Sequence, residues 1–119
     1  MIEGSCHCGA VKFTVPHAPE TVTSCNCSLC RRTGALMARY AADQLRIDAP
    51  EGATKAYVQG DRTLANHHCV TCGCLCYWVG LGEYADRASV NARLLPPDIL
   101  AKARVRRFDG ADTWTFLDP

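Results

Sequence analysis

The residues of this sequence best suited to chemistry are its nine cysteines, which fall into three groups. The groups are Cys6 and Cys8, then Cys25, Cys27 and Cys30, then Cys69, Cys72, Cys74 and Cys76. The first residues lack the basic and apolar regions of a secretory signal, so we expect a cytoplasmic protein whose thiols stay reduced. Nine thiols cannot all pair, and thiolates are good ligands for zinc. We therefore predict zinc sites in place of disulfides.

Two of the groups contain a pair of cysteines followed by glycine. Cys69 and Cys72 form a Cys-x-x-Cys loop that ends at Gly73, and the pair Cys6 and Cys8 also precedes a glycine. In such a knuckle both sulfurs face one tetrahedral ion, and glycine accepts backbone geometry that a larger residue resists. Two pairs from separate segments complete a shell of four thiolates. We therefore predict that these four cysteines form a closed, structural zinc site.

The middle group, Cys25, Cys27 and Cys30, supplies three thiols from one short segment. Three protein ligands leave one position of a tetrahedral zinc for water, a thiolate or a carbonyl oxygen, as catalytic zinc sites require. The sequence thus predicts a second, exchangeable zinc with these cysteines as the catalytic residues. A fourth protein ligand would instead make the site structural. The candidates for that fourth ligand are His67, His68, Cys74 and Cys76.

Further candidates lie close to these groups. Arg31 and Arg32 follow Cys30 directly, where their cations are able to hold an anionic substrate, although a solvated charged face is the simpler interpretation. Cys74 and Cys76 fit a strand with both side chains on one face. They are expected to be small buried residues. The alternative is that one of them acts as a redox partner or as the fourth zinc ligand.

Length, composition and charge limit the class of protein. With 119 residues, residues 1–119 are expected to form one zinc-binding domain. No apolar run approaches the roughly 20 residues of a membrane helix. The net charge of +1 provides no field that would attract nucleic acid or an anionic membrane. A structural zinc would supply stability that a small sheet protein lacks.

The elements that must position the cysteines are mostly strands. Val11 to Val15 alternates apolar and polar residues, which is typical of a strand with one buried face. Helical signal is limited to single turns over 28–32 and 97–103, the second led by Pro97. The segments expected to form strands are Ile2–Ser5, Val11–Val15, Thr21–Ser24, Leu36–Tyr40, Arg46–Ile47, Lys55–Val58, Leu75–Val79 and Ala88–Val90. The sequence predicts a mainly β fold with little helix.

Three blocks of this sequence resemble the glutathione-dependent formaldehyde-activating enzyme family, which includes centromere protein V-like proteins. The opening Gly-Ser-Cys-His-Cys-Gly-Ala-Val over 4–11 is similar to the family's first block. The run Ser-Cys-Asn-Cys-Ser-Leu-Cys-Arg-Arg-Thr-Gly over 24–34 is similar to the second, and the knuckle over 69–73 to the third. The segment 90–93 and the late Trp114 resemble the family's ending. Two features depart from the pattern: Asn26 stands where many relatives have His, and Cys74 and Cys76 are additional thiols.

The resemblance implies a β-tent fold, in which small sheets join around a structural zinc. It implies the same two zinc sites and a carbon-sulfur lyase-like activity that joins formaldehyde to glutathione, or another small thiol, as S-hydroxymethylglutathione. Two other functions stay open. One is a non-catalytic zinc module that carries a thiol or binds a protein partner, and the other is a redox or zinc-buffering protein that uses Cys74 and Cys76.

Overall fold

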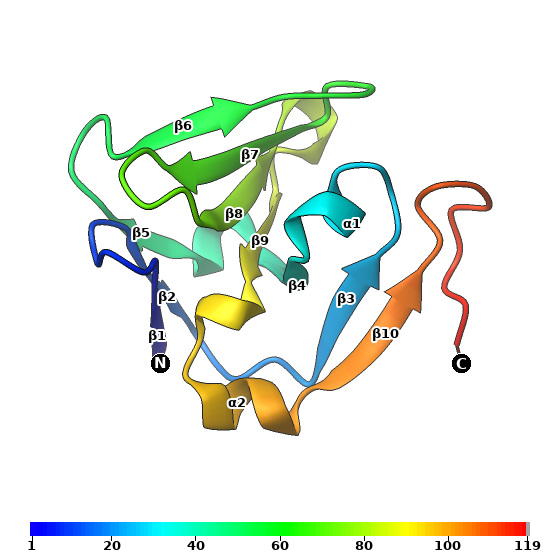
Figure 1. Cartoon of the computed structure of the whole chain (residues 1–119), viewed down its shortest axis with the longest axis horizontal. Coiled ribbons are helices and arrows are strands. Elements are labelled where there is room, and N and C mark those ends of the chain that lie inside the picture. The colour runs from blue at the N-terminus through cyan, green and yellow to red at the C-terminus, as the bar shows by residue number, and fades with distance from the viewer. Residues whose placement is uncertain (119) are drawn as a thin grey trace.

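The computed structural model describes residues 1–118, and most of its regular structure is β-strand (Figure 1). Three strands form a small sheet in the order β1-β2-β5, and seven form a larger sheet in the order β10-β3-β4-β9-β8-β7-β6. All neighbours are antiparallel except β10 and β3, which are parallel. The strands are β1 (Ile2–Ser5), β2 (Lys12–Val15), β3 (Thr21–Cys25), β4 (Leu36–Ala41), β5 (Arg46–Asp48), β6 (Thr54–Tyr57), β7 (Leu64–Cys69), β8 (Leu75–Gly80), β9 (Arg87–Asn91) and β10 (Arg104–Phe108).

Helix is limited to short pieces. The two α-helices are α1 (Cys30–Thr33) and α2 (Pro97–Lys102), and three 3-10 turns cover Ala42–Gln44, Gly82–Tyr84 and Ala92–Leu94. The prediction of a mainly β fold with little helix is confirmed, and both predicted helical turns are present within a few residues of their expected positions. No helix in the described part of the chain is long and apolar enough to cross a bilayer.

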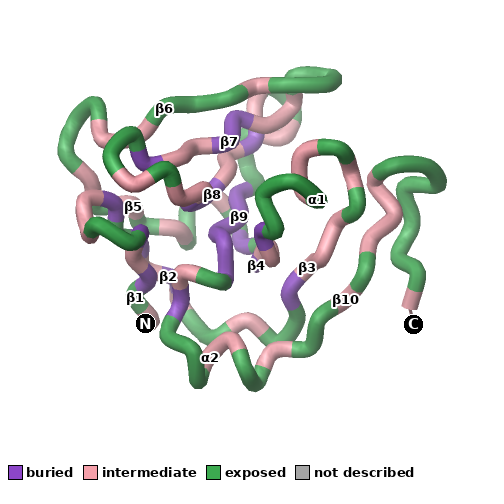
Figure 2. Tube along the Cα trace, viewed as in Figure 1, coloured by how far each residue is buried: buried purple, intermediate pink, exposed green. Residues whose placement is uncertain are grey.

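The core lies between the two sheets and contains the alternating face of β2 (Figure 2). Val11, Phe13 and Val15 are all buried, as the alternation predicted. They pack with buried residues of the larger sheet, among them Ala38 of β4 and Val90 of β9. Burial of β-branched and aromatic side chains on one face of each strand holds the sheets together. The core therefore anchors the loops that follow β1, β3 and β7, and these loops carry cysteines.

Two strands were not predicted from the sequence. β7 contains His67 and His68 and shows no clear alternation, although its Ala65 and Asn66 are buried. β10 contains three arginines among its five residues. It is the edge strand beside β3, and its first and last arginines are exposed. In both strands the position in the sheet decides the structure more strongly than the local pattern does.

A buried tyrosine links β4 to the loop after β2. The Tyr40 hydroxyl donates a hydrogen bond to the backbone oxygen of His17 at 2.8 Å, and the two rings pack with centroids 5.4 Å apart. Replacing Tyr40 with phenylalanine keeps the ring and removes the hydrogen bond. We expect the free energy of unfolding to fall by about 1 kcal/mol, measured by urea denaturation. An unchanged midpoint would show that water replaces the hydroxyl without loss.

Candidate metal centres

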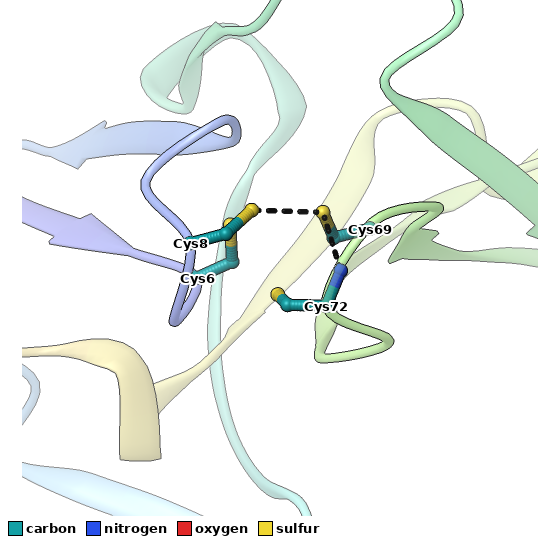
Figure 3. A group of neighbouring side chains, drawn as sticks. All are labelled: Cys6, Cys8, Cys69 and Cys72. Atoms are coloured by element: carbon teal, nitrogen blue, oxygen red, sulfur yellow. Dashed lines mark hydrogen bonds between the residues drawn. The ribbon is translucent and has the colours of Figure 1, made fainter.

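Four cysteine sulfurs meet where the loop between β1 and β2 approaches the loop between β7 and β8. The ligand atoms of Cys6, Cys8, Cys69 and Cys72 all lie within 4.8 Å of one another. Figure 3 shows the four side chains pointing toward one centre, two from each loop. The Sγ of Cys8 lies 3.7 Å from that of Cys6 and 3.6 Å from that of Cys69. The structure thus brings together the four residues that the sequence grouped.

Glycine forms the turn in each of these two loops. Gly9 and Gly73 have φ angles of +84° and +81°, a region that residues with a Cβ avoid. The Gly9 N–H donates to the oxygen of Cys6 at 3.2 Å, and the Gly73 N–H donates to the oxygen of Cys69 at 2.9 Å. Each turn folds its cysteine pair toward the same side. The glycines explain why two short sequence motifs produce matching knuckles.

The donor set of this group fits zinc. Tetrahedral zinc–thiolate bonds of about 2.3 Å place sulfurs about 3.8 Å apart, close to the spacing of the Cys8 sulfur from its neighbours. Backbone N–H groups of Cys74 and Cys8 are the largest causes that lower the pKa of Cys72 to about 5. The N–H groups of Cys72 and Thr71 lower the pKa of Cys69 in the same way. Two of the four thiols therefore lose their protons more readily than an ordinary cysteine, and the thiolate is the form that binds metal.

A second group of three sulfurs lies at the end of β3 and the start of α1. The ligand atoms of Cys25, Cys27 and Cys30 lie within 4.8 Å of one another, and all three residues are partly buried. The N–H of Cys27 donates to the Cys25 sulfur at 3.4 Å, and the N–H of Cys30 donates to the Cys27 sulfur at 3.3 Å. These hydrogen bonds turn the sulfurs inward. A single segment thus forms a three-thiol group that is able to bind a metal ion.

The three thiols differ in the direction in which their pKa values are shifted. Burial raises the pKa of Cys25 and of Cys30. Burial also acts to raise the pKa of Cys27, but the Cys30 N–H and the neighbouring thiols lower it overall. The first thiol to lose its proton is therefore that of Cys27. A bound divalent cation would deprotonate the other two as well.

None of the four residues considered as a fourth ligand belongs to the three-thiol group. Among residues 1–118, no histidine, carboxylate or additional cysteine joins the three-thiol group within 4.8 Å. His67 bonds Thr54 Oγ1 through Nδ1 at 3.0 Å and stacks on the ring of Tyr77. His68 lines a cavity of about 260 Å³, together with Leu29 and Leu75.

The two additional cysteines lie near the four-thiol group. Cys76 is fully buried in the core, as expected, and its sulfur donates to the backbone oxygen of Cys74 at 3.3 Å. Cys74 is only partly buried. Its thiol and that of Cys72 alter each other's pKa, which places Cys74 beside the four-thiol group.

The two arginines after Cys30 differ in their contacts. Both are exposed. Arg32 Nη1 donates to the backbone oxygen of Ser28 at 2.7 Å. The backbone N–H of Arg31 donates to Cys27 O at 3.0 Å, but its guanidinium makes no hydrogen bond or ion pair within the described range 1–118. Arg31 is therefore the more available of the two cations.

Two residues beside the three-thiol group, Asn26 and Gly110, were not among the predicted site residues. The Asn26 side chain makes two hydrogen bonds to the segment after β10. Its Nδ2 donates to Asp109 Oδ1 at 3.0 Å, and its Oδ1 accepts from the Ala111 N–H at 3.0 Å. Gly110 lies against Cys25, since a Cβ added there would be 2.6 Å from the Cys25 sulfur. The only signal in the sequence was that Asn26 departs from the pattern of the family that the sequence resembles.

The cysteine blocks match known proteins. The profile of the family described as "Glutathione-dependent formaldehyde-activating enzyme" matches residues 1–104. A curated Halomonas elongata protein, named "Putative glutathione-dependent formaldehyde-activating enzyme", is 57% identical over 35 residues. That segment covers 28% of this chain and only 22% of the relative.

A solved structure extends the comparison over most of the fold. A crystal structure of a Rhodobacter sphaeroides protein from structural genomics aligns with a TM-score of 0.72 and 28% sequence identity. The alignment covers 87% of this chain and 99% of that one. Because the family profile spans all three cysteine groups and most of the sequence, this chain belongs to the glutathione-dependent formaldehyde-activating enzyme family.

Proposed function

We propose that this chain is a zinc-dependent carbon-sulfur lyase-like enzyme that handles the adduct of an aldehyde with glutathione or another small thiol. The family description names glutathione-dependent formaldehyde activation, and we propose that it takes the form of S-hydroxymethylglutathione formation. The proposal takes residues 1–119 as one zinc-binding domain. It assigns one structural zinc to Cys6, Cys8, Cys69 and Cys72 and one exchangeable zinc to Cys25, Cys27 and Cys30. Nine free thiols favour the reducing cytoplasm as its compartment.

The observation that carries the proposal is the difference between the two cysteine groups. One has four sulfurs from two loops, and the other has three sulfurs from one segment without a further protein ligand among residues 1–118. Four thiolates complete the coordination of zinc, whereas three leave a position for an exogenous ligand. When bound to the three thiols, zinc would supply Lewis acidity toward a thiol sulfur or an aldehyde oxygen. The three-thiol group is therefore the proposed reaction site.

The reaction forms one bond and moves one proton. The thiol sulfur attacks the aldehyde carbon, the C=O becomes C–OH, and the proton that leaves the thiol ends on that oxygen. The residues of the chain contribute by holding the two reactants together, which converts a bimolecular encounter into a positioned one. No side chain is assigned as general base, because a thiol with an ordinary pKa of about 8.5 is already partly ionised near neutral pH.

The surroundings of the three thiols offer two substrate contacts. Arg31 carries an exposed guanidinium that suits a carboxylate of glutathione. The lining of the cavity of about 260 Å³ includes Leu29, which directly precedes Cys30, together with Thr33, Gly73 and Leu75. We assign this cavity to the body of the thiol substrate. Arg32 is the weaker candidate because it already donates to Ser28.

The test compares wild type with Cys27→Ser in a formaldehyde and glutathione assay. Cys27 carries the thiol with the lowered pKa and accepts the Cys30 N–H. We expect the enzymatic rate of S-hydroxymethylglutathione formation to fall at least about 100-fold, to the spontaneous background. Exchange NMR at low reactant concentration measures that rate.

Cys74→Ser is the matched control, because it removes a thiol that lies outside the three-thiol group. It is expected to retain wild-type activity. If wild type, Cys27→Ser and the spontaneous background gave equal rates of S-hydroxymethylglutathione formation, the proposed enzymatic activity would be refuted. If glutathione in that case still bound the wild type but not Cys27→Ser, the result would support the second candidate function, a non-catalytic zinc-binding thiol carrier.

A further inference from the structure

A loop after β10 lies on the three-thiol group. This loop, Asp109–Thr115, turns back so that Phe108 and Phe116 form an isolated antiparallel bridge. The Asp109 N–H donates to Thr115 O at 2.8 Å, and the Trp114 N–H donates to Asp109 O at 2.7 Å. Figure 1 shows β3 and β10 side by side, with their following loops next to each other. The loop lies beyond residue 104, where the family match ends.

Asn26 fastens this loop from inside the cysteine segment. Its backbone N–H donates to Phe108 O at 3.2 Å. Its side chain donates to Asp109 Oδ1 at 3.0 Å and accepts from the Ala111 N–H at 3.0 Å. The other carboxylate oxygen of Asp109 accepts from the N–H and the hydroxyl of Thr113, at 3.2 and 2.9 Å. The residue between two proposed metal ligands thus holds the first part of the loop directly and is linked to Thr113 through Asp109.

The fastened loop contacts the ligands themselves. A Cβ added at Gly110 would lie 2.6 Å from Cys25 Sγ and 3.3 Å from Cys27 Cβ, so only glycine lets the backbone approach so closely. The same point is 3.5 Å from the ring of Trp114. The loop therefore covers the Cys25 side of the group and limits the rotamers that the Cys25 sulfur is able to adopt.

We propose that Asn26 is a positioning residue that holds the Asp109–Thr115 loop against Cys25 and thereby slows the loss of metal from the three-thiol group. This inference rests on the proposed metal site and needs no aldehyde chemistry. With the loop in place, a competing ligand reaches the ion only from the side away from Gly110. With the loop released, the Cys25 sulfur turns away, and the ion is held by fewer ligands.

The test uses protein loaded with cobalt(II), whose thiolate absorption reports each site, and measures metal release to a chelator. The phase missing in Cys27→Ser identifies the three-thiol group. Asn26→Ala is expected to speed that phase about tenfold, the factor that corresponds to losing hydrogen bonds of this kind. The phase from the four-thiol group should stay unchanged.

Two further variants make the result specific. Asp109→Ala should speed the same phase. The double variant with Asn26→Ala should speed it by less than the product of the two single effects, because both remove the hydrogen bond that Asn26 shares with Asp109. Gly110→Ala leaves Asn26 intact but places a Cβ against Cys25 Sγ, so it should also speed release and keeps the test open if Asn26→Ala folds poorly. Asp112→Ala, an exposed change in the same loop, is the control.

The outcomes separate this inference from the proposed function. Equal release rates for Asn26→Ala, Gly110→Ala and wild type would overturn the positioning role even if the aldehyde assay succeeded. Faster release from both metal groups would also overturn it, because the effect would then be general loosening of the fold. A selective effect in a protein without aldehyde activity would support the positioning role and leave the proposed enzyme refuted.

Discussion

Replacing Cys69 with serine is expected to prevent stable folding. Cys69 is fully buried, belongs to the hydrophobic core and contacts Cys8 from the other loop. A structural zinc contributes about 10–16 kcal/mol in small domains, comparable with the whole stability of about 5–15 kcal/mol. Loss of one of four ligands therefore removes more stability than this small fold has in reserve. Circular dichroism and metal analysis should show a disordered chain with at most one zinc.

The matched control for that change is Cys76→Ser. Cys76 is as buried as Cys69 but lies outside both metal groups. A serine hydroxyl at this position is able to keep the hydrogen bond that the Cys76 sulfur donates to Cys74 O. We expect a cost of about 1–3 kcal/mol with both zincs retained. If Cys69→Ser melted like Cys76→Ser and kept its metal, the four-thiol group would not be a structural zinc site.

The four-thiol group was predictable because its signal is local. Each pair is followed by a glycine with positive φ, and the geometry of such a turn is encoded in a few residues. The pairing of the two loops then follows from the number of ligands that zinc needs. The strand from Lys12 to Val15 was predictable for a similar reason, since the buried Phe13 and Val15 alternate with the more exposed Lys12 and Thr14.

Features that depend on distant partners could not be predicted. β7 is a central strand between β6 and β8, yet its His67 and His68 look polar in isolation, and a bulge separates them in the pairing with β8. β10 becomes a strand because β3 offers a parallel edge to its backbone. Strand pairing of this kind depends on tertiary context more than on local pattern.

Which residues surround the three-thiol group also depends on distant parts of the fold. Sequence distance alone allowed Cys74 or His68 to approach the three-thiol group. The turn between β7 and β8 instead places Cys74 beside Cys72, and His68 faces a cavity. The contact between Gly110 and Cys25 joins residues far apart in sequence, with no motif at position 110. The parallel pairing of β10 with β3 and the hydrogen bonds of Asn26 bring them together.

Mild chelation is expected to remove one of two bound zincs while the protein stays folded. The three thiols belong to one continuous segment, so losing their ion breaks no link between distant parts of the chain. The four thiols join residues 6–8 to residues 69–72, and two of them are buried. A chelator of moderate affinity should therefore take the ion from the three-thiol group first.

This partition is measurable by following zinc release and far-ultraviolet circular dichroism in the same sample. The first zinc should leave with unchanged circular dichroism, and the thermal midpoint should fall only after the second leaves. Aldehyde activity should disappear with the first zinc and return when one equivalent is added back. Release of both ions in a single step, together with unfolding, would contradict the division into structural and exchangeable sites. The distinction matters because the proposed chemistry requires an ion that accepts a new ligand without opening the fold.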